Sequence, residues 1–287
     1  MRLHSAFFLV AVVVAALPTA ASAIDGVLEI NQTCVAVGCF AGDEPGFPVT
    51  IDRDQPGSYR LTSSLVNLDP DVSTIVIQDD HLTLDLNGFA VSGPTVCTGI
   101  GATLSCSPTS LAPAIDAFSP VVPVGVTIKN GVVRGSPSIA IRMAGSGHRI
   151  EGVHVVGNAG VGIDVGDKSV VERCRVIRNG GGIEVLGSGL VRGSVVIGND
   201  GGSISSAGTL VVRTNVIREN AFAVSFGGGS GSLLTESAVT NNGSEAFLFG
   251  TDGYSQNVLR GNGSTGSQVT AGSEIGPNLC GSDTSCP

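Results

Sequence analysis

The chain has 287 residues, a formal net charge of −9 and a hydrophobic content of 42%. That much apolar sequence can form a core, which excludes an intrinsically disordered chain. Glycine, with 42 residues, is about twice as common as usual and methionine occurs only twice, a composition that excludes a helical bundle. The negative charge argues against a nucleic-acid-binding protein, so we expect no nucleic-acid partner.

The first residues have the pattern of a secretory signal peptide. Arg2 precedes an uninterrupted apolar run over 6–17, Pro18 ends that run, and 21–23 supply small residues for cleavage. The run is too short to span a bilayer comfortably, and no later apolar segment reaches membrane length. We therefore expect a secreted or periplasmic protein with no membrane span after signal removal.

Six of the seven cysteines occur in close pairs, which are Cys34 with Cys39, Cys97 with Cys106, and Cys280 with Cys286. An oxidising compartment favours three short-range disulfides, although spacing alone leaves the connectivity open. Zinc binding is the alternative, but no pair has the CxxC spacing and no histidine lies close to one. The remaining Cys174 occupies an apolar-periodic position and is predicted to be a buried free thiol rather than a nucleophile.

The middle of the chain repeats with a period near 21 residues. The first apolar residue before each turn serves as a marker, and it falls at Val133, Val155, Val176, Val196, Val216, Ala238 and Val258. An earlier match places Val91 two periods before Val133, with 97–106 looping out of the first of them. Self-similarity at such a period is typical of stacked repeats.

A second marker, an apolar-x-apolar triplet, runs in phase with the first. It occurs at 115–117, 141–143, 163–165, 183–185, 204–206, 224–226 and 247–249. Each triplet is short, alternates with period two and is bracketed by Gly, Asn or Ser, which predicts a strand. Strands this short cannot each bury a face alone, whereas stacked coils cover one another.

A period near 21 with short strands and no helical segment predicts a parallel β-helix, because a leucine-rich repeat lacks its signature here and a propeller needs about twice the period. A column of Asn158, Asn179, Asn199 and Asn241, with Glu219 in the gap, predicts an amide ladder at a turn. These Asn-ended coils and the segment 83–93 resemble the right-handed parallel β-helix of the pectin-lyase-like superfamily over 75–262. The chain also resembles uncharacterised secreted bacterial repeat proteins.

The resemblance implies an all-β, right-handed parallel β-helix (solenoid) with an N-terminal cap and a disulfide-bearing C-terminal tail. The expected organisation is a signal peptide over 1–23, an N-terminal cap region over 24–74, β-helix repeats over 75–262 and a Gly- and Ser-rich tail over 263–287. Polar caps prevent end-to-end pairing of exposed strand edges.

The middle residues of the triplets form a first candidate column, which reads Asp116, Arg142, Asp164, Glu184, Ser205, Ser225 and Leu248. Asp164 and Glu184 would be like charges on adjacent strands, about 4.8 Å apart. The functional interpretation is a carboxylate pair for acid–base chemistry on a glycan, or a weak Ca²⁺ site. The alternative is a solvated ladder in which Arg142 bridges Asp116 and Asp164.

A second candidate column reads Val132, His154, Arg175, Val195, Asn215, Ser237 and Asn257. His154 beside Arg175 could supply the base and the charge neutraliser that a lyase needs. The alternative is a surface of Glu–Arg pairs that serves solubility, with Glu151 and Glu172 near several arginines. A turn separates His154 from Asp164, and the sequence does not place both in one groove.

No complete catalytic set emerges, tryptophan is absent, and Phe222, Phe226, Phe247 and Phe249 are expected in the core rather than as sugar platforms. We expect a non-catalytic module that binds an extracellular or envelope polysaccharide or serves a structural role at the surface. The resemblance implies the alternative, a polysaccharide lyase or glycoside hydrolase acting on an acidic polysaccharide. We expect no cofactor except Ca²⁺ in the carboxylate alternative, and a groove is sought first beside the loop 95–113.

Overall fold

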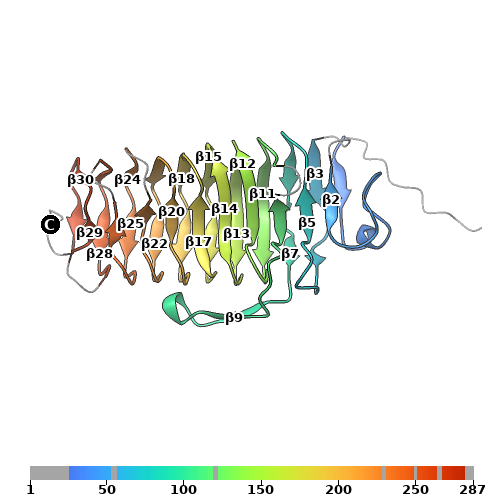
Figure 1. Cartoon of the computed structure of the whole chain (residues 1–287), viewed down its shortest axis with the longest axis horizontal. Helices are drawn as coiled ribbons and strands as arrows, with labels where there is room; N and C mark the ends of the chain where they lie inside the picture. Colours follow the sequence, from blue (N-terminus) through green and yellow to red (C-terminus); the bar gives the residue numbers. More distant parts are fainter. Residues whose placement is uncertain are drawn as a thin grey trace, which may run out of the picture.

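The computed structural model describes residues 26–52, 57–118, 122–227, 231–248, 251–263 and 267–281. The predicted signal peptide over 1–23 and Cys286 lie outside these residues. The chain winds into an elongated stack of parallel coils, with the N-terminal coils at one end and the C-terminal coils at the other (Figure 1). The prediction of a parallel β-solenoid is therefore confirmed.

One side of the solenoid is a ten-stranded parallel sheet, called face B here, with one strand per coil. Its strands are β2 (Val49–Ile51), β5 (Ile75–Ile77), β10 (Ile115–Ala117), β12 (Ile141–Ser146), β14 (Val161–Asp167), β17 (Gly181–Val185), β20 (Ile204–Ser206), β23 (Ser225–Phe226), β26 (Ala246–Phe247) and β29 (Val269–Thr270). The predicted triplets align in register along this sheet as far as β23.

A nineteen-stranded sheet supplies the other two rows of strands. Face A1 consists of β1 (Leu28–Ile30), β3 (Ser58–Leu61), β6 (Thr83–Asp85), the first halves of β11 (Thr127–Arg134) and β13 (Arg149–Val156), β15 (Ser169–Glu172), β18 (Gly189–Arg192), β21 (Leu210–Arg213), β24 (Leu233–Thr235), β27 (Gly253–Ser255) and β30 (Ser273–Glu274). Face A2 consists of β4 (Leu65–Val66), β7 (Ala90–Ser92), the second halves of β11 and β13, β16 (Arg175–Ile177), β19 (Val195–Ile197), β22 (Val216–Arg218), β25 (Ala238–Thr240), β28 (Val258–Arg260) and β31 (Leu279–Cys280).

The sheets continue into both predicted end regions. Strands β1 to β4, from the N-terminal region, pair within the two sheets, and β29 to β31 extend them at the other end. The only helices among the described residues are two short 3-10 turns, η1 (Cys34–Ala36) and η2 (Gly101–Thr103). The described chain is therefore almost entirely β.

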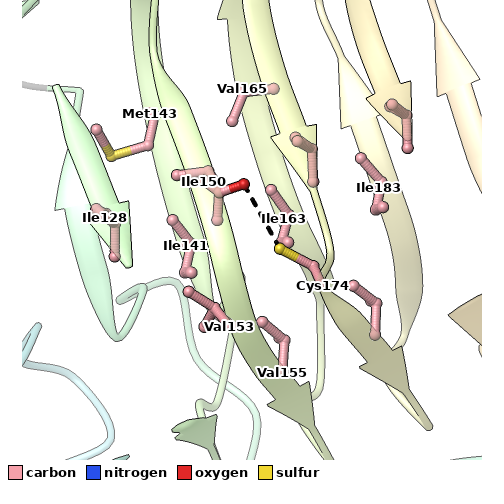
Figure 2. Packing of buried hydrophobic residues seen from close by; sticks show 14 of the residues in the cluster. Ile128, Ile141, Met143, Ile150, Val153, Val155, Ile163, Val165, Cys174 and Ile183 are labelled. Atoms are coloured by element: carbon pink, nitrogen blue, oxygen red, sulfur yellow. Dashed lines mark hydrogen bonds between the residues drawn. The ribbon is translucent and has the colours of Figure 1, made fainter. Parts of the chain in front are cut away.

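The core is a column of aliphatic side chains that point inward from all three faces. Val155, Val176 and Val196 are paired from coil to coil and are fully buried, as the repeat predicts. Ile128 and Ile150 from face A1 pack with Ile141 and Ile163 from face B (Figure 2). Burying one such side chain contributes about 1.5–3 kcal/mol, so each coil stabilises the next.

After Val196, the buried residue of each coil lies one position later than the predicted marker. The buried column continues through Ile217, Val239, Leu259 and Cys280. The predicted markers Val216, Ala238 and Val258 point outward instead, and Val216 and Val258 are each 41% exposed. Each of these coils has two adjacent aliphatic residues, so hydrophobicity alone did not identify the inward one.

Val91 pairs directly with Val133, so the step of 42 residues from one to the other is one coil rather than the predicted two turns. The extra length is the excursion around the antiparallel hairpin of β8 (Val96–Thr98) and β9 (Ser105–Ser107). This hairpin projects from one coil and runs beside the solenoid (Figure 1).

The tip of the hairpin contacts a distant coil. The N–H of Gly101 donates to the C=O of Gly198 at 2.9 Å. Gly198 has φ +67°, and a Cβ at this position would lie 2.5 Å from Cγ1 of Ile100, so glycine is needed there. The hairpin therefore reaches from the coil of β7 to that of β19.

A buried ladder of asparagine side chains stabilises the turn after face A2. Its members are Asn158, Asn179, Asn199, Asn220, Asn242 and Asn262, all at most 3% exposed. Each Oδ1 from Asn179 onward accepts the backbone N–H and the Nδ2–H of the Asn one coil earlier, and Asn199 accepts from Asn179 at 2.9 and 3.1 Å.

The ladder differs from its prediction in two members. Asn220 fills the supposed gap at Glu219, and Asn242 takes the place of Asn241. Glu219 and Asn241 are the preceding residues, and they have positive φ of 58° and 55°. The left-handed residue of these turns therefore directly precedes the asparagine that belongs to the ladder.

A second ladder, which the sequence analysis missed, stabilises the turn between faces A1 and A2. It consists of Cys174, Ser194, Asn215, Ser237, Asn257 and Asn278, and each side chain from Ser194 onward accepts the preceding member's backbone N–H. The prediction that Asn215, Ser237 and Asn257 continue the outward column of His154 is therefore wrong. That column passes instead to Val216, Ala238 and Val258.

Two of the three predicted disulfides are confirmed, Cys34–Cys39 and Cys97–Cys106. The third cannot be followed because Cys286 is outside the described residues. Cys174 is free and buried as predicted, and burial raises the pKa of its thiol to about 11. A thiol that stays protonated at neutral pH is a poor nucleophile.

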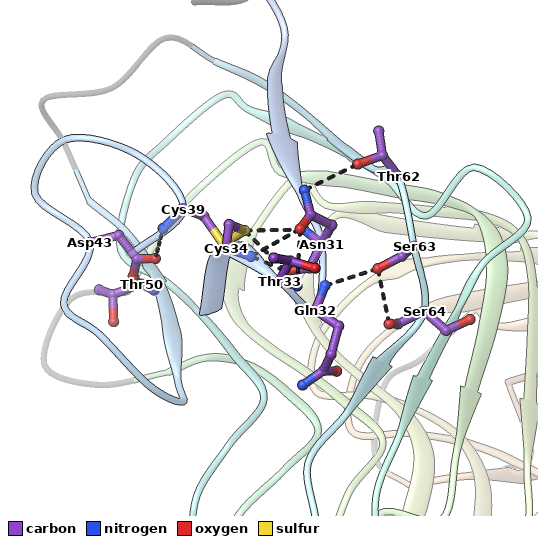
Figure 3. The surroundings of a disulfide bond; sticks show 10 residues. All are labelled: Asn31, Gln32, Thr33, Cys34, Cys39, Asp43, Thr50, Thr62, Ser63 and Ser64. Carbon is purple, nitrogen blue, oxygen red and sulfur yellow. Dashed lines mark hydrogen bonds between the residues drawn. A yellow bond between two sulfur atoms is a disulfide. The ribbon is translucent and has the colours of Figure 1, made fainter. Parts of the chain in front are cut away.

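The Cys34–Cys39 bond closes a loop at the N-terminal end of the solenoid (Figure 3). Asn31 Oδ1 accepts the backbone N–H groups of Thr33 and Cys34, at 3.0 and 2.9 Å. The Asp43 carboxylate accepts those of Cys39 and Thr50, at 2.8 and 2.9 Å. These contacts satisfy polar groups of the end loop and tie it to β2.

Removing one rung of the amide ladder should destabilise the fold strongly. Asn199→Ala leaves two donors of Asn179 and the C=O of Val176 without their partners, and we expect a loss of about 2–4 kcal/mol in the free energy of unfolding. Urea denaturation measures this loss. Asn241→Gly, at an exposed turn position with positive φ, is the control and should cost less than about 0.5 kcal/mol. Equal losses would contradict the observed register.

His148 should make the stability fall under mildly acidic conditions. Its Nδ1 accepts the N–H of Val126 at 3.3 Å and its Nε2 lies 2.6 Å from the C=O of Ala144, so the ring is neutral and burial lowers its pKa. A lowered folded pKa means that this stability is present above about pH 6.5 and is lost as pH falls.

The stability difference between wild type and His148→Gln should therefore narrow by about 1 kcal/mol between about pH 7.5 and about pH 5.5. Urea denaturation at both pH values gives the difference. A gap that stays constant would mean that His148 does not titrate in this window.

Candidate functional site

The outward column of face B is the first candidate site, and the strand register confirms most of it. Asp116, Arg142, Asp164, Glu184, Ser205 and Ser225 are successive partners. The last predicted member is wrong, because Ser225 pairs with Phe247 and Leu248 is fully buried. The triplet of that coil is therefore 246–248, one residue earlier than predicted.

The side chain of Arg142 forms an ion pair with Asp116. Its Nε and Nη2 donate to the two carboxylate oxygens, each at 2.9 Å, and its guanidinium lies 4.6 Å from the ring centre of Phe118. Hydrogen bonding to Asp116 raises the pKa of Arg142 further, although burial opposes this. Arg142 has no hydrogen bond to Asp164, so the predicted bridge between the two carboxylates has only its Asp116 half.

Asp164 and Glu184 lie side by side on β14 and β17. Burial, reinforced by the charge of Glu184 and opposed by Arg142, raises the pKa of Asp164 to about 6. Oδ1 of Asp164 is buried without a hydrogen-bond partner. Asp164 therefore keeps its proton up to about pH 6, much higher than an ordinary aspartate, which is the kind of shift a general acid needs.

A cavity of about 470 Å³ lies beside the loop, where the sequence analysis looked for a groove. Its lining residues are Asp71, Ser73, Ser110, Leu111, Ala112, Pro113, Asp116 and Arg142. Ser110 Oγ donates to Asp71 Oδ1 at 2.6 Å, which joins the base of the hairpin excursion to the loop after β4. Asp164 and Glu184 do not line the cavity.

The second candidate pair lies on another face. His154 and Arg175 are paired on β13 and β16 of face A2, whereas Asp164 is on face B. Burial and the charge of Arg175 lower the pKa of His154, and its Nε2 is buried without a hydrogen-bond partner. The two candidate sets belong to different sheets and do not converge on one site.

Comparisons with known proteins bear on the fold. The family model for the right-handed β-helix region matches residues 112–215. The chain has the fold of a right-handed parallel β-helix. No significant match was found to a curated protein or to a solved structure. The comparisons therefore support the fold of the β-helix and name no substrate.

The arginines of face A1 serve the structure of the β-helix. Glu172 is fully buried under Arg149, Arg173 and Arg192, and Arg192 contacts it at 2.7 Å. Arg149 and Arg173 also contact Glu151. This network matches the Glu–Arg pairing that the sequence offered as the alternative to a lyase site.

The phenylalanines divide between core and surface. Phe226 is fully buried as predicted, whereas Phe222 is 55% exposed and its prediction is wrong. The side chain of Phe247 and all of Phe249 lie outside the described residues. Phe118, at 49% exposed, is an aromatic surface beside Arg142 that the sequence analysis did not select. It follows β10 directly, so the triplet pattern could have indicated its position.

No group of three or more His, Cys, Asp or Glu side chains in the described part of the β-helix is arranged to hold a metal ion. Asp164 and Glu184 supply two carboxylates, fewer than the six to eight oxygen ligands that Ca²⁺ takes. The described residues also contain no helix long and apolar enough to cross a membrane.

Asp164→Asn should stabilise the protein at neutral pH. The pKa of Asp164 is raised from 3.8 to about 6, so this group destabilises the folded state increasingly as pH rises from about 4 to about 6, and the cost is lost only as pH falls below about 4. We expect a gain of about 1–2 kcal/mol near pH 7.5 that is about halved near pH 5 and vanishes below about pH 4, measured by urea denaturation. Asp116→Asn, which weakens the ion pair with Arg142, should instead destabilise, and a loss in both variants would contradict the assignment.

Proposed function

We propose that this chain is an exported, non-catalytic β-helix module that binds an extracellular or envelope polysaccharide at the cavity on face B. The observation that carries the proposal is the 470 Å³ cavity, in which the charged side chains of Asp116 and Arg142 stand on neighbouring strands of face B. Asp116 and Arg142 hold each other in place, and Ser110 holds Asp71. Such preorganisation lowers the entropic cost of binding a ligand.

The charges of face B favour a neutral polysaccharide over an acidic one. Asp71 and Asp116 face a single cation in the cavity, and Asp164 and Glu184 add two carboxylates further along the face. Carboxylates accept hydrogen bonds from sugar hydroxyls but repel uronate groups. The exposed ring of Phe118 beside Arg142 adds an apolar surface for a sugar face.

Export fits the covalent structure. Two disulfides, Cys34–Cys39 and Cys97–Cys106, persist in an oxidising compartment and are rare in the cytosol. They support a secreted or periplasmic location, together with the predicted signal peptide. Both disulfides lie outside the regular coils, in loops at the N-terminal end and beside face A2.

Binding to a panel of neutral and acidic polysaccharides, measured by calorimetry on the mature protein, tests the proposal. We expect a neutral polymer to bind and Asp71→Asn combined with Ser110→Ala to weaken it at least about tenfold. Ser225→Ala, in the same outward column but away from the cavity, should have no effect. The proposal fails if no polysaccharide binds, or if the cavity and control variants behave alike.

An enzyme is the second candidate, and Asp164 is the observation that favours it. Adjacent strands lie about 4.8 Å apart, close to the separation of about 5–5.5 Å that retaining glycoside hydrolases use. A protonated Asp164 would act as the acid and Glu184 as the second carboxylate. A hydrolase fits this geometry better than a lyase, since His154 and Arg175 lie on face A2.

Assays for new reducing ends and for unsaturated sugars separate these possibilities. Any turnover would overturn the non-catalytic proposal. Hydrolysis that is lost in both Asp164→Asn and Glu184→Gln would establish the carboxylate pair. Hydrolysis that survives both changes would place the chemistry elsewhere, and Arg213→Gln provides a control change on face A1.

A further inference from the structure

Face A2 has a surface that the polysaccharide proposal does not use. Two outward columns run along it. One consists of Ala90, Val132, His154, Arg175, Val195, Val216, Ala238, Val258 and Leu279, and the other of Ser92, Arg134, Val156, Ile177, Ile197, Arg218, Thr240 and Arg260. Val216, Val258 and Leu279 are 41%, 41% and 45% exposed. The face is therefore aliphatic and basic.

The arginines of this face stand largely without acidic partners. No aspartate or glutamate occupies a strand position in either column of the described coils. The side chains of Arg175, Arg260 and the turn residue Arg178 make no hydrogen bond or ion pair within the described residues. Arg218 has only a 3.9 Å contact with Glu219, and Arg134 donates to a serine hydroxyl.

Face A1 shows that this lack of pairing is not general. Its arginines Arg149, Arg173, Arg192 and Arg213 all contact glutamates. Those pairs contribute to the folded structure, whereas the A2 arginines leave their charge available to a partner. A concentration of free positive charge is unexpected in a chain with a net charge of −9.

The arginines are also regularly placed. Arg134 and Arg218 lie four coils apart in one column, and Arg260 lies two coils beyond Arg218. Arg175 and Arg178 flank that column on the coil midway between Arg134 and Arg218. Two coils span roughly 10 Å, so a row of cations extends about 30 Å along a rigid surface. The column positions between the arginines are occupied by Val156, Ile177, Ile197 and Thr240.

The hairpin extends the apolar surface at its edge. Ile100 is 38% exposed and lies against Gly198, which directly follows Ile197. Val96, in the same hairpin, is 69% exposed. Aliphatic side chains therefore border the row of arginines on both the sheet and the hairpin.

This chemistry does not suit a sugar polymer or a nucleic acid. The outward positions of the face carry no Phe, Tyr or Trp in the described coils, and Ser92 and Thr240 are its few neutral hydroxyls. Sugar rings and bases are bound through aromatic stacking and hydrogen bonds. Arginines among exposed aliphatic residues instead match an amphiphilic anion, with phosphate at the guanidinium groups and acyl chains at the valines and isoleucines.

We propose that face A2 docks on an anionic lipid surface and lies flat against the phosphate layer. The carboxylates of face B belong to a different sheet of the solenoid. Attraction of the free arginines to lipid phosphate would therefore select face A2 for contact. Docking leaves the cavity on face B available, so this inference is independent of the polysaccharide proposal.

Co-sedimentation with vesicles tests the inference. The mature protein should bind vesicles that contain phosphatidylglycerol in phosphatidylcholine, and should not bind pure phosphatidylcholine vesicles. Removing three charges in Arg175→Gln, Arg218→Gln and Arg260→Gln together should weaken binding about 100-fold. The control combines Arg60→Gln, Lys168→Gln and Arg213→Gln, which removes equal charge elsewhere and should change binding less than about threefold.

The aliphatic contribution has its own matched pair of variants. The double variant Val216→Thr, Val258→Thr keeps the β-branched shape on face A2. It should bind vesicles more weakly than the wild type does, and the difference should persist in high salt. Val170→Thr with Val211→Thr, outward on face A1, should leave vesicle binding unchanged. Circular dichroism confirms that each variant is folded.

Three outcomes would overturn the inference. One is that phosphatidylglycerol vesicles do not bind. Another is that the A2 and control variants lose binding equally. The third is that soluble polygalacturonate binds through the same arginines while vesicles do not, which would make this face a polyanionic glycan site. Failure of the cavity variants on face B would bear only on the polysaccharide proposal.

Discussion

Every coil of this protein depends on the next one for its hydrogen bonds and for burial of its apolar side chains. No described strand is longer than eight residues, and most have three, too few to be stable alone. The buried asparagines add a constraint that hydrophobic side chains do not provide, because an amide out of register loses both its acceptor and its donors. Register, and with it the position of every outward side chain, follows from these ladders.

Much of the fold could be predicted from the sequence because period and strand pattern are local properties. The triplets of face B aligned as predicted through β23, since a single polar residue between two apolar ones defines the outward position. The marker on face A2 failed after Val196, where Val216 and Ile217 are both apolar and only the neighbouring coil selects the buried one. Glu219 and Asn241 were predicted as ladder positions for a similar reason, since each is a polar turn residue directly before the true ladder member, Asn220 or Asn242.

The candidate sites were less predictable, because they combine residues whose spacing depends on loops and sheets. The adjacency of Asp164 and Glu184 followed from the repeat, but the commitment of Arg142 to Asp116 did not. Asp71 lines the cavity and accepts a hydrogen bond from Ser110, which belongs to a loop whose path the sequence does not predict. The separation of His154 from Asp164 became clear only when the chain between them was seen to turn from face A2 to face B.

The hairpin changes how the solenoid as a whole should behave. In a simple repeat array each unit contacts only its neighbours, so stability is a sum of local terms and the ends can fray independently. The bond from Gly101 to Gly198, and the approach of Cys106 to Asn158, connect the coil of β7 to coils well beyond its immediate neighbour. The disulfide-closed hairpin holds together the coils that it bridges, so these coils cannot separate one at a time. The central coils should therefore open as one cooperative block, while fraying is confined to the coils on either side of the bridged span.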